Sequence, residues 1–421
     1  MSRWRWLLQK LGRQLWLRAT LVGSLGIFAA LFALVADRFI PWELPRSIGA
    51  DAVDTILNII ASSMLAVTTF SLSVMTSAFG SATSNVTPRA TRLLMEDRLT
   101  QNVLSTFVGS FLFGIVGIVV LQTGAYGERG RAVLFAVTIA VIALIVFMLL
   151  RWIDYLMRLG RVGETTGRVE DAARQAIEAR RAAPSLGARP LIAPETAVPP
   201  GATDVTAAEV GYLQHIDMPA LAECAEEIGG EIFVLLNPGA FVYPGTVMGR
   251  VAGPRGVEDP EALVAQLRKA FSLGPERSFD QDPRFGLAVM SEIGSRALSS
   301  AVNDPGTAID VIGRNTRLMT LWAAAAGPDE VRYPRLHLPL LTDADLFEDA
   351  FMLMARDGAG HIEVQLRLQK ALAALSGMGS ESFRAAARRQ AALASARAEA
   401  ALTLPEDRER LRRAAALVQA G

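Results

Sequence analysis

The chain has 421 residues, of which 51% are hydrophobic, and its 42 basic residues balance 42 acidic ones. The balanced charge gives no sign of a nucleic-acid partner, and the single cysteine, Cys224, excludes an internal disulfide and any metal site built from several cysteines. A mean hydropathy of +0.30 is typical instead of a protein that lies partly in lipid.

Four apolar stretches of about the 20 residues that cross a bilayer occupy the first part of the chain. They are residues 15–36, 55–79, 103–123 and 132–152. The first has a basic start, as a secretory signal does, but its apolar run is long and three more spans follow. We therefore expect it to stay as an anchor, and we predict a four-helix transmembrane domain over residues 1–160.

Basic residues in the flanks of these spans predict their orientation. Residues 1–18 carry five Lys or Arg and no acidic residue, and Arg also recurs in residues 80–102 and after the fourth span. Cytoplasmic loops collect Lys and Arg, so both termini should be cytoplasmic. Tryptophans prefer membrane interfaces, and we expect this of five of them: Trp4, Trp6, Trp16, Trp42 and Trp152.

The second span carries more hydroxyl groups than a helix in lipid requires. Alternate steps of four and three residues from 62 to 87 follow one helix face, and every position on it is small. We expect Leu65, Leu72 and Phe79 on the opposite side. The positions of the stripe are Ser62, Ala66, Thr69, Ser73, Thr76, Gly80, Thr83 and Thr87.

Two causes would produce this stripe. Copies of the helix could surround a water-filled path, with Ser62, Thr69, Ser73, Thr76 and Thr83 lining it and Arg89 and Arg92 at its cytoplasmic mouth. Alternatively, small residues let helices approach closely. No charged residue lies in the middle of a span, which argues against a proton relay or an ion-coupled pump.

Small residues in the third span favour packing of helices against each other. They recur about every four residues, the spacing at which two backbones can meet. They are Ser105, Gly109, Ser110, Gly114 and Gly117.

The rest of the chain predicts a cytoplasmic α+β region. Residues 161–204 indicate an amphipathic helix and a linker rich in Pro, Gly and Ala. Residues 205–254 indicate a small β-rich domain with one helix near 219–228, and residues 255–421 a helical domain. The predicted fold class is thus membrane α-helical, with four transmembrane helices and a C-terminal cytoplasmic α+β region.

Candidate chemistry in this region is sparse. Asn303 and Asp304 before Pro305 indicate a helix start; the alternative is a ligand-binding site for an anion there, with Arg296 nearby. The three histidines fit no recognised metal-ligand spacing, and Thr342 with Asp343 indicates a helix cap. No nucleophile elbow, phosphate-binding loop or cofactor motif occurs, so we predict no metal, no cofactor and no enzyme.

Two segments are distinctive beside the four-span plan: "SNVTPRATRLLMEDRLTQNVLSTFVGSFLFGI" and "GSRALSSAVNDPGTAIDVI". With that plan, they resemble a bacterial family of predicted membrane proteins known as domain of unknown function 2254. The similarity covers nearly the whole chain. It implies a multi-pass protein of the bacterial inner membrane, and the family brings no established activity.

We therefore expect a homo-oligomeric protein of the inner (cell) membrane. Its partners would be the lipid bilayer, other copies of itself and ions, with no nucleic acid. The most concrete hypothesis is an ion channel whose pore is lined by the second span and whose cytoplasmic domain assembles or gates it. The alternatives are a non-conducting membrane-anchored scaffold or sensor and, third, an integral membrane enzyme.

Overall fold

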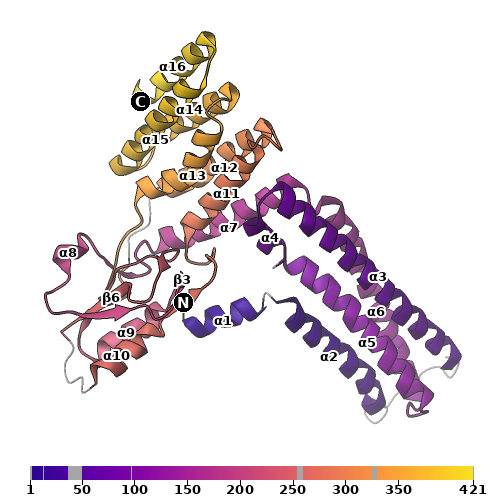
Figure 1. Cartoon of the computed structure of the whole chain (residues 1–421). Coiled ribbons are helices and arrows are strands. Elements are labelled where there is room, and N and C mark those ends of the chain that lie inside the picture. Colours follow the sequence, from indigo (N-terminus) through magenta and orange to yellow (C-terminus); the bar gives the residue numbers. More distant parts are fainter. Residues whose placement is uncertain are drawn as a thin grey trace. The chain divides into compact units, whose positions relative to one another are not determined.

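The computed structural model describes residues 2–12, 14–36, 50–95, 97–253, 259–324 and 330–420, drawn in Figure 1. Internal contacts divide the chain into two compact units. We call residues 7–84 and 91–165 the membrane unit, and residues 1–6, 85–90 and 166–421 the C-terminal unit. Each unit has its own core.

The membrane unit is a bundle of four long helices that run side by side (Figure 1). The four predicted spans are helices that are long and apolar enough to cross a membrane; their apolar parts are residues 15–33, 52–84, 98–122 and 130–158. The bundle helices are α2 (Leu15–Ala36), α3 (Ala50–Asn85), α5 (Arg98–Gln122) and α6 (Glu128–Arg158). In the chain, the short helix α1 (Arg3–Gly12) precedes α2 and the short helix α4 (Pro88–Met95) follows α3; each has residues in both units.

Glycines bring the helices of the bundle together. A Cβ on Gly26 of α2 would lie 2.4 Å from the carbonyl oxygen of Gly109 on α5, so the two backbones touch there. A Cβ on Gly114 of α5 would lie 3.2 Å from both the Leu57 carbonyl oxygen and the Ala61 side chain of α3. The packing role predicted for the small residues of the third span is thus confirmed at these positions.

Two of the predicted interfacial tryptophans are buried in protein instead. Trp152 lies in the core of the bundle, where its indole N–H donates to Ser71 Oγ at 2.9 Å, and Trp6 lies in the C-terminal unit. The expectation was wrong for both, because a polar partner inside the protein satisfies the ring N–H. Trp4 and Trp16 are exposed, and Trp42 lies outside the described residues.

Helices make up most of the C-terminal unit, and several begin at a side-chain cap. Asp217, Asp282, Asp304, Thr342 and Ser380 each accept a backbone N–H at the start of a helix. The helices are α7 (Val162–Ala182), α8 (Pro194–Ala197), α9 (Met218–Glu227), α10 (Pro260–Arg268), α11 (Pro283–Ala297), α12 (Pro305–Ala323), α13 (Asp343–Asp357), α14 (Ile362–Ser376), α15 (Glu381–Ala401) and α16 (Pro405–Ala420).

The β part of this unit comprises two sheets among the described residues. Their orders are β1-β8-β4-β6-β2 and β5-β3-β7. Strand β8 pairs in parallel with β1 and β4, and the other pairs are antiparallel. The strands are β1 (Ala188–Pro190), β2 (Thr203–Thr206), β3 (Gly211–Ile216), β4 (Glu231–Val234), β5 (Phe241–Val242), β6 (Val247–Ala252), β7 (Phe271–Gly274) and β8 (Tyr333–Leu338).

The sheets draw on more of the chain than the predicted β-rich range 205–254. Strands β1 and β2 and the short helix α8 fall wholly or partly in the predicted linker, and β7 and β8 fall in the range expected to be helical. Pairing between β8 and β1 joins residues far apart in sequence, such as Arg189 and His337, which are 148 positions apart, and no local pattern carries that signal. Residues 254–258, at the predicted boundary between the two domains, lie outside the described residues.

Candidate functional site

The hydroxyl stripe of α3 lies on the exposed side of that helix. Ser62, Thr69, Ser73, Thr76 and Thr83 are all exposed, and only Thr87, beyond the end of α3, is buried. A Cβ on Gly80, which belongs to the same stripe, would meet nothing within 4 Å. The chain's own described residues therefore leave this face uncovered along the whole span.

Most hydroxyl groups of the stripe donate to their own helix. Thr69 Oγ1 donates to the Ala66 carbonyl at 2.9 Å, and Thr76 and Thr83 donate to the carbonyls four residues earlier, both at 2.8 Å. Ser62 does the same to Asn58 at 2.7 Å. Each of these bonds satisfies the one donor of the hydroxyl, and the oxygen keeps its capacity to accept a hydrogen bond from outside the helix.

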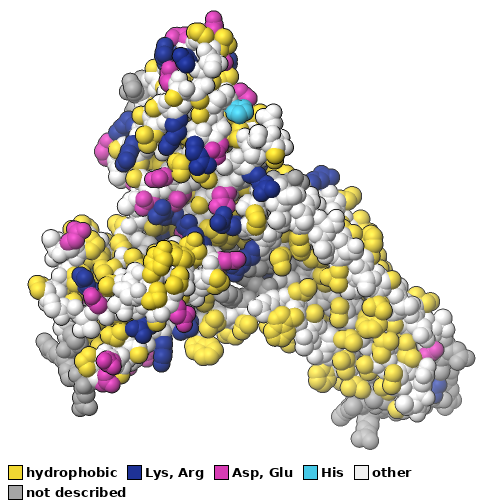
Figure 2. Space-filling view, in the orientation of Figure 1, with side chains coloured by type: hydrophobic (Ala, Val, Ile, Leu, Met, Phe, Trp, Pro, Cys, Tyr) yellow, Lys and Arg dark blue, Asp and Glu magenta, His cyan; other side chains and the backbone are white. Residues whose placement is uncertain are grey.

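Leucines lie beside the stripe instead of opposite it. Leu65 and Leu72 are exposed, so their expected position was wrong. A helix turns by about 100° per residue, which puts Leu65 only some 60° away from Ser62. The side that packs on the bundle carries Met64, Ser71 and Met75 instead. On the face of the membrane unit that Figure 2 shows, hydrophobic side chains gather at the surface with few charged ones among them.

The two arginines expected at a pore mouth lie on α4. Arg89 belongs to the C-terminal unit, where its Nη1 contacts Glu292 Oε1 of α11 at 2.6 Å. Thr87 Oγ1 donates to the other oxygen of Glu292 at 3.2 Å. Arg92 is half-buried in the last turn of α4. Glu292 thus balances the charge of Arg89 and fixes the segment that directly follows α3.

Asp304 acts as the cap of α12. Its carboxylate accepts the backbone N–H of Thr307 at 3.0 Å and the hydroxyl of Thr307 at 2.6 Å. The hydrogen bond from the Thr307 hydroxyl is the main cause that lowers the pKa of Asp304, and the bond from the Thr307 backbone N–H lowers it as well. Asn303 adopts the left-handed backbone conformation, with φ of 50°, which lets the chain turn from α11 into α12. Arg296 is half-buried in the last turn of α11. The capping interpretation is confirmed, and the ligand site stays a prediction.

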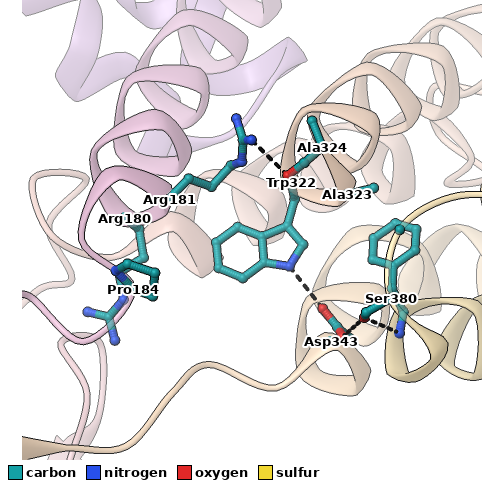
Figure 3. Close-up of a pocket in the computed structure, with 10 residues that line it drawn as sticks. Arg180, Arg181, Pro184, Trp322, Ala323, Ala324, Asp343 and Ser380 are labelled. Carbon is teal, nitrogen blue, oxygen red and sulfur yellow. Dashed lines mark hydrogen bonds between the residues drawn. The ribbon is translucent and has the colours of Figure 1, made fainter. Parts of the chain in front are cut away.

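A cavity of about 450 Å³ lies among α7, α12, α13 and the start of α15 in the C-terminal unit (Figure 3). Arg180 and Arg181 lie on one side of the Trp322 indole, and Asp343 and Ser380 lie on the other. The Asp343 carboxylate is hydrogen-bonded to other side chains of the protein: it accepts the Trp322 N–H at 2.9 Å and hydrogen bonds from the Ser382 and Ser380 hydroxyls. This cavity could not be predicted from the sequence, because its wall comes from helices far apart in the chain and forms no motif.

No metal centre emerges from the described part of the chain, where no group of three His, Cys, Asp or Glu side chains is placed to hold an ion. His337 lies 3.5 Å from Glu231 across the sheet, and burial is the main cause that lowers its pKa. His361 precedes α14 as the residue at its N-cap position.

Comparison with known proteins identifies uncharacterised relatives from mycobacteria. The chain is 29% identical over 288 residues to an uncharacterized protein of Mycobacterium bovis and to one of Mycobacterium tuberculosis. The match covers 63% of this chain, which spans about half the length of these curated relatives. No solved structure matches.

The family comparison covers more of the chain. The family model described as "Predicted membrane protein (DUF2254)" matches residues 12–374, from the end of α1 to α14. Because that match covers well over half of its length, the chain belongs to the DUF2254 family of predicted membrane proteins.

Proposed function

We propose that the protein forms a homo-oligomeric, channel-like pore in the bacterial inner membrane, in which the exposed face of α3 from several copies lines a shared path. The observation that carries the proposal is that the hydroxyl stripe remains uncovered by the chain's own described helices. From Ser62 to Thr83 it extends about 32 Å, enough to cross the hydrocarbon layer of a bilayer.

The chemistry of the stripe suits weak, repeated contact with a hydrated ion. Conduction requires ligands that replace part of the hydration shell and still release the ion. Hydroxyl oxygens that donate to their own helix, as those of Thr69 and Thr76 do, can accept a contact from water or a cation. The side chains that lie on this face within the span are uncharged, so no fixed charge would trap an ion midway.

The C-terminal unit would assemble or gate the pore. Residues 85–90, which continue the chain directly from α3, belong to this unit and are fixed to α11 through Glu292. A change in the position of α11 would therefore act on the end of α3 first. The Lys and Arg count in the flanks supports a cytoplasmic location for this unit and for both termini.

The second candidate function is a non-conducting scaffold or sensor. The large exposed side chains Leu65, Phe70 and Leu72 beside the stripe favour it, because they suit contact with lipid or with another helix. In that case the small residues would only let copies pack closely. An integral membrane enzyme ranks third, since no set of catalytic residues emerges from the described residues.

Native mass measurement in detergent and planar-bilayer recording test the proposal together. We expect an oligomer that conducts, and Thr69→Leu should strongly reduce the current by placing an apolar side chain in the path. The matched control is Val146→Leu, which enlarges an exposed apolar side chain on α6. A monomeric particle, or equal currents in both variants, would refute the pore, whereas an oligomer without current would favour the scaffold.

A further inference from the structure

The first turn of α1 is anchored on the C-terminal unit. Trp6 is only 3% exposed, and its indole N–H donates to Asp280 Oδ2 at 2.8 Å. The backbone N–H of Arg3 donates to the carboxylate of Asp217, and the Arg3 guanidinium donates to the Lys269 carbonyl at 2.6 Å. Residues 3–6 are thus held by several independent contacts.

The surface that receives this turn is built from separate segments. His215 is the second-last residue of β3 and Asp217 caps α9. Lys269 precedes β7, and Asp280 lies in the loop before α11. The two carboxylates also have partners within the unit: Asp217 accepts the Ala220 N–H at 3.1 Å, and Asp280 accepts the Ser278 hydroxyl at 3.0 Å. The C-terminal unit therefore holds both acceptors in place itself.

His215 provides a flat wall for the indole. Its ring lies parallel to that of Trp6, with 5.1 Å between the ring centroids and 18° between the planes. The His215 side chain is fully buried, and neither ring nitrogen has a hydrogen-bond partner within the described residues. A histidine with that environment acts here through its ring face, as a surface for stacking.

We propose that residues 3–6 form a strap by which the C-terminal unit controls the first membrane-spanning helix. The strap opens α1, and α1 leads within a few residues into α2 at Leu15. When Trp6 is docked on His215, residues 3–6 are held by the C-terminal unit. Movement of the β3, β7 and α9 region is then transmitted through α1 to the first residues of α2. When Trp6 is released, that link is lost while the C-terminal unit keeps its own core.

Hydrogen–deuterium exchange of the full-length protein in lipid nanodiscs tests the strap. In Trp6→Ala we expect exchange in residues 3–12 to become about tenfold faster or more, because docking no longer protects the helix. We also expect faster exchange in the first turn of α2. Trp4→Ala is the matched control: it removes the same side chain at a position that is 76% exposed, and exchange should stay unchanged.

Changes on the receiving side separate the ring contact from simple loss of stability. His215→Ala should release the strap, and His215→Phe should retain it, because phenylalanine keeps a flat ring. Unchanged exchange in Trp6→Ala would overturn the docking. Faster exchange in residues 3–12 without any change in α2 would overturn the control of α2. Trp6 belongs to the strap itself, so its replacement removes nothing from the sheets that receive it.

Discussion

Glu170 shows how single residues keep charge inside the C-terminal unit. Its carboxylate is nearly buried on α7 and accepts hydrogen bonds from Arg314 at 2.8 Å and from Arg317 at 2.8 and 2.9 Å, both on α12. Burial raises the pKa of Glu170, but the hydrogen bonds and charges of Arg317 and Arg314 outweigh it, so the pKa falls below its usual value. The ion cluster fastens α7 to α12.

Removing this carboxylate should destabilise the protein. We expect Glu170→Gln to lower the free energy of unfolding by about 2 to 3 kcal/mol. The loss is smaller than for a fully buried ion pair, because Arg317 is half exposed and solvent screens its charge. Thermal or denaturant unfolding measures the change. The stabilisation should be present above pH 4.5 and fall as the pH drops through the lowered pKa. Glu381→Gln, an exposed glutamate paired with Arg384 and Arg388, should show no comparable loss.

His215 gives the strap a dependence on pH. Its pKa falls from 6.5 to about 4, chiefly because of burial; the N-terminal amino group and Arg3 also lower the pKa, whereas Asp217 and Asp280 raise it. Because the docked state disfavours the protonated ring, docking should be strongest above pH 6.5 and weaken as the pH falls towards about 4.

Exchange rates of residues 3–12, corrected for intrinsic chemistry, should therefore rise over this pH range. In His215→Phe, which has no ionisable ring, the rise should be much smaller. Equal pH dependence in the two proteins would assign the effect to Asp217 or Asp280 instead of His215.

At the scale of elements, the contact between α2 and α5 depends on the absence of side chains. Gly26→Ala places a Cβ 2.4 Å from the Gly109 carbonyl oxygen, a distance that real Cβ atoms do not show, so the helices must separate. We expect a lower melting temperature and a cost of about 1 to 3 kcal/mol, as for overpacked cores. Gly80→Ala on α3 meets nothing within 4 Å and should be neutral or slightly stabilising. Equal melting temperatures for both variants would contradict the close contact.

Elements with a strong local signal could be predicted from the sequence, and elements defined by distant partners could not. The four spans, α7 and the helices from α11 to α16 follow from apolar runs, helical periodicity and caps such as Asp304 and Thr342. Strand β1 has three residues and owes its existence to β8, so its sequence reads as a linker. The same holds for the candidate sites: the α3 stripe is visible as a spacing, whereas the Trp6–His215 contact joins residues more than 200 apart.

For the whole molecule, the strap bears on membrane topology. Residues 1–6 have their contacts in the C-terminal unit. Two candidate spans separate them from residues 85–90 of that unit and four separate them from residues 166–421, and both numbers are even. We therefore expect a cysteine at Trp4 and one at Leu417, both exposed positions, to lie on the same, cytoplasmic side.

In a Cys224→Ser background, a membrane-impermeant maleimide should label both cysteines in inverted vesicles and neither in intact cells. Labelling of one position from outside and the other from inside would rule out the arrangement with both termini in the cytoplasm. It would equally rule out docking of Trp6 on the C-terminal unit in the cell.

The apolar part of α3, residues 52–84, is longer than a single crossing of the bilayer requires. At 33 residues it measures about 50 Å, against a hydrocarbon layer of about 30 Å. A helix of that length must tilt or project from the hydrocarbon layer, and the free-energy cost of each arrangement changes with the length of the acyl chains. Bilayer thickness therefore becomes a variable that acts directly on this helix, and thinner or thicker membranes should shift its inclination before they disturb the shorter apolar parts of α2 and α5.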